Sequence, residues 1–160
     1  MTIYKHYNQE QLNDQFNTRL HVPDYATYFE RWENLSKQTE NNHTHFKNVF
    51  FGTGPEECLD IFPADKPSSK TMIFIHGGYW HLLDKSLFHF LASSFLKQGV
   101  TIAFINYKLA PDYSIDEIVC SCRQAIRWVH DNIIRYNGDK SEIYVLGHSA
   151  GGHLASMLYT

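Results

Sequence analysis

Gly147-His148-Ser149-Ala150-Gly151 is the stretch that decides the fold of this chain. An apolar run, residues 143–146, directly precedes it, and a helix-like run, residues 152–158, directly follows it. The G-x-S-x-G nucleophile elbow requires this order of a strand, a sharp turn that carries serine, and a helix. We therefore expect Ser149 to be a nucleophile at the tip of a strained turn. The other interpretation of the same residues is a turn of small residues that only packs a helix against a sheet.

A second motif, His76-Gly77-Gly78-Tyr79-Trp80, ends an earlier apolar run. Acyl-transfer chemistry develops a negative oxygen, and backbone N–H groups must point at it. A glycine pair lets the backbone approach that oxygen, because no Cβ is in the way. We expect the oxyanion hole to be formed by the amides of Gly78, Tyr79 and Ala150. An ordinary strand-to-loop glycine turn is the alternative for this motif taken alone.

The remaining residues of the two motifs are expected to support the oxyanion donors and the serine. The supporting loop residues are His76, Gly77, Trp80, Gly147 and Gly151. Of these, His76 is expected to brace the oxyanion loop, and the glycines of the elbow allow strand and helix to approach closely. His148 is expected to orient the turn and not to act as a base.

Helices alternate with apolar strands in the second part of the chain. The predicted strands are residues 45–51, 57–62, 71–75, 100–105 and 143–146, and the predicted helices are residues 86–97 and 115–133. Continuous apolar runs are typical of strands buried on both faces of a parallel sheet. The alternating run 57–62 predicts a half-exposed strand instead, and Gly138 is expected to end the long helix in a left-handed conformation. This order predicts an α/β fold with a mostly parallel sheet, preceded by an antiparallel pair.

Residues 1–42 are polar with interleaved aromatic side chains. They predict two short helices that separate near Val22-Pro23-Asp24, because proline restricts the residue before it. Two interpretations stay open, a cap over an active site and an arm packed on the body. The expected organisation is therefore an N-terminal helical arm or cap at 1–42 and a core at 43–160.

Composition excludes several classes of function. The net charge is −3 with scattered Lys and Arg, so we expect no nucleic-acid partner. Three cysteines without a C-x-x-C spacing predict no disulfide framework and favour a reducing compartment. The polar N-terminus and the absence of a long apolar run predict a cytoplasmic protein with no membrane partner. No metal or other cofactor is expected, since neither a metal-ligand spacing nor a phosphate-binding glycine loop is present.

These motifs resemble those of a known family. His76-Gly77-Gly78, the elbow, and Asn106-Tyr107-Lys108-Leu109-Ala110-Pro111 are similar to segments of α/β-hydrolase esterases of the hormone-sensitive-lipase type. The forms His-Gly-Gly-Tyr-Trp and Gly-His-Ser-Ala-Gly-Gly-His are more similar to the arylformamidase (kynurenine formamidase) branch. The resemblance implies the α/β-hydrolase fold, with helices on both faces of the sheet, and serine-hydrolase chemistry. It departs from the family at Tyr79, where a third glycine often stands.

The family's catalytic triad runs in the order serine, acid, histidine. After Ser149 this chain offers only His153, which we expect to be structural and to point into or along the helix packing. The expectation is therefore the N-terminal part of the fold, with its C-terminal part, triad acid and triad histidine missing. The strand at 143–146 would then have an unpaired edge, through which the chain is expected to self-associate.

The predicted activity is hydrolysis of aryl formamides or small carboxylic esters by a nucleophilic serine. The partner would be a small-molecule ester or formamide substrate. Two alternatives stay open, a general carboxylesterase and a non-catalytic truncated remnant.

Overall fold

A computed structural model describes residues 2–158, with the backbone alone at Thr18. Five strands form one sheet in the order β1-β2-β4-β3-β5. The strands are β1 (Phe46–Phe50), β2 (Cys58–Phe62), β3 (Ser69–Ile75), β4 (Thr101–Ile105) and β5 (Gly138–Gly147). The α-helices are α1 (Gln9–Phe16), α2 (Tyr25–Asn42), α3 (Ala92–Lys97), α4 (Ile115–Asn132) and α5 (Ala150–Met157). Three 3-10 helices are η1 (Thr18–His21), η2 (Lys85–Leu91) and η3 (Ile133–Tyr136).

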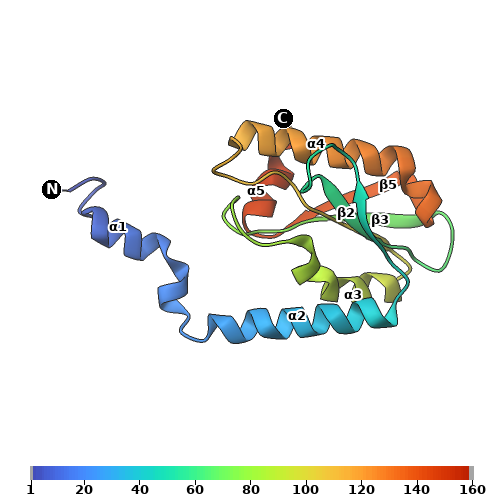
Figure 1. Cartoon of the computed structure of the whole chain (residues 1–160), viewed down its shortest axis with the longest axis horizontal. Helices are drawn as coiled ribbons and strands as arrows, with labels where there is room; N and C mark the ends of the chain where they lie inside the picture. The colour runs from blue at the N-terminus through green and yellow to red at the C-terminus, as the bar shows by residue number, and fades with distance from the viewer. Residues whose placement is uncertain (1, 159–160) are drawn as a thin grey trace.

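The sheet is mixed. β1 pairs antiparallel with β2, and β2 pairs antiparallel with β4. β3 lies between β4 and β5 and is parallel to both. Helices cover both faces, with α4 and α5 on one side and η2, α3 and α2 on the other (Figure 1). The predicted alternation of strands and helices is therefore confirmed, but the expectation of buried strands fails for β5, where Tyr144 and Leu146 are exposed.

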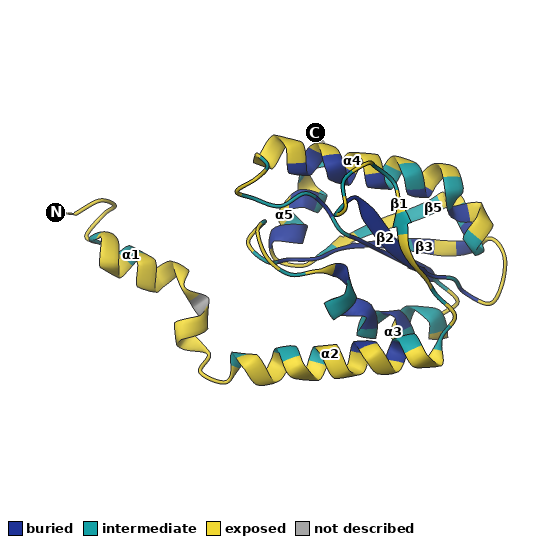
Figure 2. Ribbon diagram, viewed as in Figure 1, coloured by how far each residue is buried: buried dark blue, intermediate teal, exposed yellow. Residues whose placement is uncertain are grey.

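The core has one apolar layer on each face of the sheet, because successive side chains of a strand point to opposite faces. In β4, Ile102 and Phe104 face η2 and α3, whereas Ala103 and Ile105 face α4 and α5. Trp128 of α4 is half-buried against the layer between the sheet and α4, with its ring 6.3 Å from that of Tyr136. The ribbon coloured by burial shows β2 as buried, whereas β5 is largely intermediate or exposed (Figure 2).

The prediction of a half-exposed β2 is wrong, since every residue of this strand is buried. Its polar member, Asp60, is fully buried beside the side chains of a lysine and a histidine. Lys85 Nζ and His89 Nε2 lie 3.4 and 3.0 Å from Asp60 Oδ2. A buried carboxylate requires such partners, and they come from η2, which a pattern within β2 does not reveal.

Two further predictions need correction. The expected helix at 86–97 begins as the 3-10 helix η2, with Asp84 accepting a hydrogen bond from the Ser86 amide (2.8 Å), and becomes α-helical only at Ala92. The left-handed residue after η3 is Asn137, with φ of 62°, and not Gly138. Gly138 already belongs to β5, where a Cβ would collide with the side chains of Ile133 and Thr71.

The N-terminal segment extends away from the sheet as α1, η1 and α2 (Figure 1). α2 is an 18-residue helix and not the short one expected. It lies along η2, with Trp32 packed against Phe88 and Phe90 at ring distances of 5.8 and 5.9 Å. No helix within residues 2–158 is long and apolar enough to cross a membrane.

Candidate functional site

Ser149 occupies the turn between β5 and α5, where it is the N-cap residue of the helix. Its φ of 54° and ψ of −119° lie in a region that residues with a Cβ rarely adopt. The residue is exposed. The backbone therefore has the strained, solvent-facing geometry that was predicted for the tip of the elbow.

The glycines on either side make this turn possible. A Cβ on Gly147 would overlap the carbonyl oxygen of Gly151, and a Cβ on Gly151 would overlap the carbonyl oxygen of Ile75. The His148 amide donates to that same Ile75 carbonyl at 3.1 Å, so the elbow is hydrogen-bonded to β3. The close approach of strand and helix leaves no room for side chains at either glycine.

The loop after β3, residues 77–80, is the oxyanion loop of the sequence analysis. Gly78, Tyr79 and Trp80 all have positive φ, at 115°, 57° and 62°. Left-handed backbone costs about 1–2 kcal/mol for each residue with a Cβ, so two such residues in succession must be held by their surroundings. Gly77 packs directly against the elbow, since a Cβ there would lie 2.9 Å from the His148 carbonyl oxygen. The structure therefore brings the two predicted motifs together.

The three predicted oxyanion donors share one property. Within residues 2–158, no acceptor is found for the backbone N–H groups of Gly78, Tyr79 and Ala150. Ala150 is the first residue of α5, so its amide has no partner inside the helix. Unpaired N–H groups at a helix N-terminus and on an adjacent loop are suited to binding a negatively charged oxygen.

His76 lies beneath this loop and is buried. Its Nδ1–H donates to the Gly77 carbonyl at 2.7 Å, and its ring stacks on Tyr107 with centroids 4.4 Å apart. The Tyr107 hydroxyl donates to the His76 carbonyl at 2.8 Å. Burial lowers the pKa of His76, because the charged imidazolium would lose its water. A neutral His76 bonded to its own loop fits the expected bracing role.

The expectation for His153 is wrong. This residue is exposed and does not point into the helix packing. Its Nδ1 instead accepts a hydrogen bond at 3.3 Å from Nε1 of Trp80, a residue of the oxyanion loop. His148 is also exposed, and its ring lies 6.0 Å from that of Phe88. No hydrogen bond joins the Ser149 hydroxyl to either histidine in the described part of the chain.

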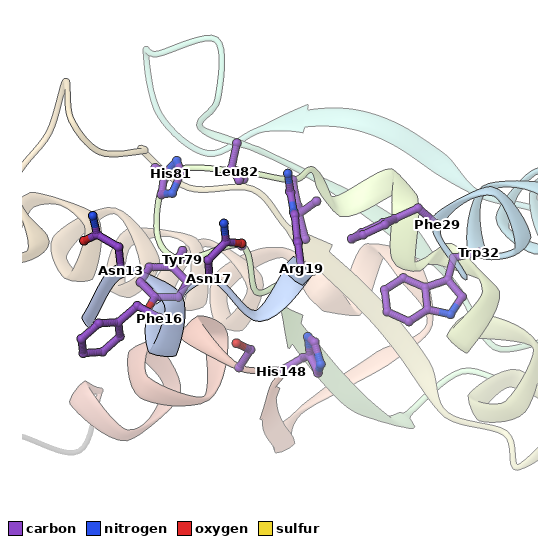
Figure 3. A pocket seen from close by; sticks show the side chains of 13 residues that line it. Asn13, Phe16, Asn17, Arg19, Phe29, Trp32, Tyr79, His81, Leu82 and His148 are labelled. Carbon is purple, nitrogen blue, oxygen red and sulfur yellow. The ribbon is translucent and has the colours of Figure 1, made fainter. Parts of the chain in front are cut away.

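A cavity of about 790 Å³ opens at the elbow, between the core and the N-terminal arm. Ser149, His148, Gly78 and Tyr79 line it from the core. Side chains from the first 42 residues line it as well, and Figure 3 shows them together with Tyr79 and His148: Asn13, Phe16, Asn17, Arg19, Phe29 and Trp32. None of these arm residues was among the predicted site residues. The interleaved aromatics of the arm were the available signal, but their spacing does not show which cavity they face.

Polar contacts hold the arm against the core. Glu40 Oε1 of α2 lies 2.7 Å from His89 Nδ1, and Glu40 Oε2 lies 3.0 Å from Lys47 Nζ. His89 is fully buried between Glu40 and Asp60, although its Nε2 is not aligned for a hydrogen bond with Asp60. Burial alone would raise the pKa of Glu40, but Lys47 and His89 outweigh it and lower the pKa. Burial would likewise raise the pKa of Asp60, but the contacts with His89 and the Asn48 amide outweigh it and lower that pKa.

The chain is similar in sequence and fold to known esterases and formamidases. A family model described as BD-FAE matches residues 59–160. A kynurenine formamidase from Salmo salar is 34% identical over 113 residues, which are 69% of this chain and 37% of that protein. A probable isoprenylcysteine alpha-carbonyl methylesterase from Oryza sativa subsp. japonica is 33% identical over 69% of this chain and 26% of that protein. The chain thus spans between about a quarter and just over a third of the length of these relatives.

Solved structures agree with the sequence relatives. A putative thioesterase from Silicibacter sp. TM1040 matches with a TM-score of 0.80 and 30% identity, over 89% of this chain and 53% of that one. A truncated carbohydrate esterase from gut microbiota matches with a TM-score of 0.68 and 28% identity, over 73% of this chain and 44% of that one. The expected α/β-hydrolase fold is confirmed, as is the resemblance that the motifs carried.

Proposed function

Because the chain belongs to the BD-FAE family, we propose that it carries the nucleophile and the oxyanion hole of a serine hydrolase that acts on aryl formamides or small carboxylic esters. One observation carries the proposal. Ser149 is exposed on a strained turn beside three backbone N–H groups that have no acceptor within residues 2–158. This combination suits attack on a carbonyl carbon, because the charge that develops on the oxygen finds donors already in place.

In the proposed reaction the Ser149 Oγ attacks the carbonyl carbon, and its proton passes to a base. The amides of Gly78, Tyr79 and Ala150 hold the resulting oxyanion. The C–O or C–N bond of the substrate then breaks, and the alcohol or amine leaves with a proton. Water hydrolyses the acyl-serine and regenerates the hydroxyl. We assign the base and its acid partner to the portion of the relatives' length that this chain does not span.

We propose that the acyl group is short, formyl or acetyl. Tyr79 and Trp80 are large rings on the loop that carries two of the oxyanion donors, and they occupy space that a longer chain would need. Each methylene in an apolar pocket changes the free energy that discriminates two substrates by about 1–3 kcal/mol. Strong rejection of a longer acyl chain therefore needs several extra carbons. A general carboxylesterase is the second candidate, since the relatives include a methylesterase as well as a formamidase.

We further propose that residues 1–42 are a cap for this site. The lining of the cavity by Phe16, Arg19 and Phe29 supports this role over that of an arm packed elsewhere on the body. The location proposed for the protein is the cytoplasm.

A second copy of the chain is the proposed partner of the free edge of β5. This strand ends the sheet order, and its Tyr144 and Leu146 are exposed. Unpaired backbone groups on an apolar strand favour edge-to-edge association. Sedimentation at increasing concentration tests this, and a monomer throughout would contradict it.

A covalent probe tests the nucleophile. With imidazole added as an external base, because the proposed base lies outside this chain, a 4-nitrophenyl phosphonate should add one phosphonyl group to Ser149, located by peptide mass spectrometry. Ser149→Ala should abolish the addition, whereas Ser94→Ala, at an exposed serine of α3, should not change it. Hydrolysis of formyl, acetyl, butyryl and octanoyl esters of one phenol, and of an aryl formamide, then ranks the substrates. Labelling that persists in Ser149→Ala contradicts the mechanism, and equal turnover of octanoyl and acetyl esters contradicts the short acyl preference.

A further inference from the structure

We propose that His153 is a positioning residue that fixes the oxyanion loop, residues 77–80, relative to the helix that follows Ser149. This inference rests on the proposed function, because it concerns how the oxyanion donors are held. The donors lie on two separate elements. Gly78 and Tyr79 belong to the loop after β3, whereas Ala150 begins α5. One oxygen can meet all three N–H groups only if the loop and the helix keep a fixed relative position.

The contact between the two elements is specific. Trp80 Nε1–H donates to His153 Nδ1 at 3.3 Å. The two rings also meet edge to face, with centroids 5.3 Å apart and planes at 87°. Because the indole nitrogen is a donor only, Nδ1 must be the acceptor, and the imidazole proton therefore lies on Nε2.

The other hydrogen bonds of the loop do not reach α5. The Leu82 amide donates to the Gly78 carbonyl at 2.9 Å, which closes the loop on itself. The Ala110 amide donates to the Trp80 carbonyl at 2.9 Å, which connects the loop to the segment after β4. Within residues 2–158, the Trp80–His153 pair is the side-chain hydrogen bond that joins the loop to the helix of the elbow.

The position of His153 on α5 suits this role. Its amide bonds to the Ser149 carbonyl at 3.3 Å, so it lies one helical turn beyond the serine. Residues at this spacing share one face of a helix, and the face of His153 is therefore that of Ser149. The loop it holds is strained at Tyr79 and Trp80, so a loop without this anchor is expected to relax toward ordinary φ values.

Nuclear magnetic resonance of the 15N-labelled chain tests the geometry without requiring activity. His153→Leu removes the acceptor, and His153→Asn keeps an acceptor near the position of Nδ1. We expect His153→Leu to shift the Trp80 indole N–H resonance and the amide resonances of Gly78 and Tyr79, and His153→Asn to keep them near their original positions. His130→Leu, at an exposed histidine of α4, is the matched control and should leave all three unchanged. Unchanged Gly78 and Tyr79 amides in His153→Leu would overturn the proposal.

The rate of Ser149 phosphonylation provides the second readout. Loss of a single oxyanion donor slows catalysis by about 10²–10³-fold in other enzymes, so a misplaced loop should slow phosphonylation by about tenfold or more. His153→Asn should restore the rate to within about threefold. An unchanged rate in His153→Leu overturns the positioning role while leaving the nucleophile in place. If Ser149 of the unaltered chain takes up no phosphonyl group, the proposed function fails, and the resonances alone decide whether His153 holds the loop.

Discussion

Strands β2 and β4 are buried at every position, whereas α1 buries no residue and α2 buries only Ser36 and Thr39. The first region is held by apolar packing on both faces of a sheet. The second is held at its end nearest the core, through hydroxyls, Trp32 and the Glu40–His89 pair. The arm lines the cavity at the elbow together with the loops that follow β3 and β5 of the sheet. The difference teaches that Ser149, the proposed nucleophile, stands on the well-buried part of the molecule, whereas the opposite wall of the cavity belongs to a segment with little buried surface.

Apolar truncation should have the largest effect and should separate the two regions most clearly. We expect Phe104→Ala to lower the free energy of unfolding by about 3–5 kcal/mol, because it empties a fully buried site. The matched change in the arm is Phe16→Ala, where the side chain is 65% exposed. It should change the free energy by no more than about 0.5 kcal/mol. Urea denaturation measures both, and equal losses would show that arm and core unfold as one unit.

The elbow glycines give the next largest effect. Gly151→Ala should destabilise the core by about 1–3 kcal/mol or more, because its Cβ would overlap the backbone of Ile75 and His76. Gly152→Ala is the matched control. Its Cβ would meet only the Gly147 carbonyl at 3.4 Å, so better helix propensity should stabilise the chain by about 0.5–1 kcal/mol. Thermal unfolding of both variants is the measurement, and a destabilised Gly152→Ala would contradict this view of α5.

Removing the charge of Glu40 should weaken the arm without unfolding the core. We expect Glu40→Gln to reduce the stability of arm docking by about 1–2 kcal/mol, since a charge-assisted contact to buried His89 is lost. Hydrogen exchange should therefore speed up in α2 and not in β3 or β4. The control is Glu33→Gln, which removes only an exposed pair with Lys37. Faster exchange throughout the sheet would mean that the arm is part of the core.

Mild acid should also weaken the docking of the arm, but by less than Glu40→Gln does. The pKa of Glu40 lies below its ordinary 4.5, and that of Asp60 lies below its ordinary 3.8. A lowered pKa in the folded state stabilises docking fully above the ordinary value, and this contribution is lost as the pH falls through the lowered one. Exchange in α2 should thus be constant, after correction for intrinsic rates, from pH 6 to about pH 5 and should rise below about pH 4.5. A rise already at pH 6 would contradict the role of these carboxylates.

The strands and the elbow were predictable because their signals are local. Continuous apolar runs identified β3 and β4, since a strand buried on both faces has no polar side to display. The spacing of Ile118, Cys122 and Val129 identified the buried face of α4. The strained turn at Ser149 followed from the glycines around it, because only glycine permits so close an approach.

The remaining features depend on residues far apart in the chain. Asp60 is buried because Lys85 and His89 come from another element, so the alternation in β2 was misleading. His153 meets Trp80 across the site, and the cavity gains its second wall from residues 13–32. Such pairings are set by tertiary packing, and no spacing within one element encodes them.

The three tryptophans of the chain lie in three different regions of the molecule. Trp32 belongs to the arm, Trp80 to the oxyanion loop and Trp128 to α4 of the core. Each has a different neighbour: the phenylalanines of η2 for the first, an imidazole for the second and Tyr136 for the third. The chain therefore contains its own set of optical probes. With two of the three tryptophans replaced by phenylalanine, the fluorescence of the remaining indole reports on one region alone. Three such variants would therefore follow a displacement of the arm, a rearrangement of the oxyanion loop and the unfolding of the core separately.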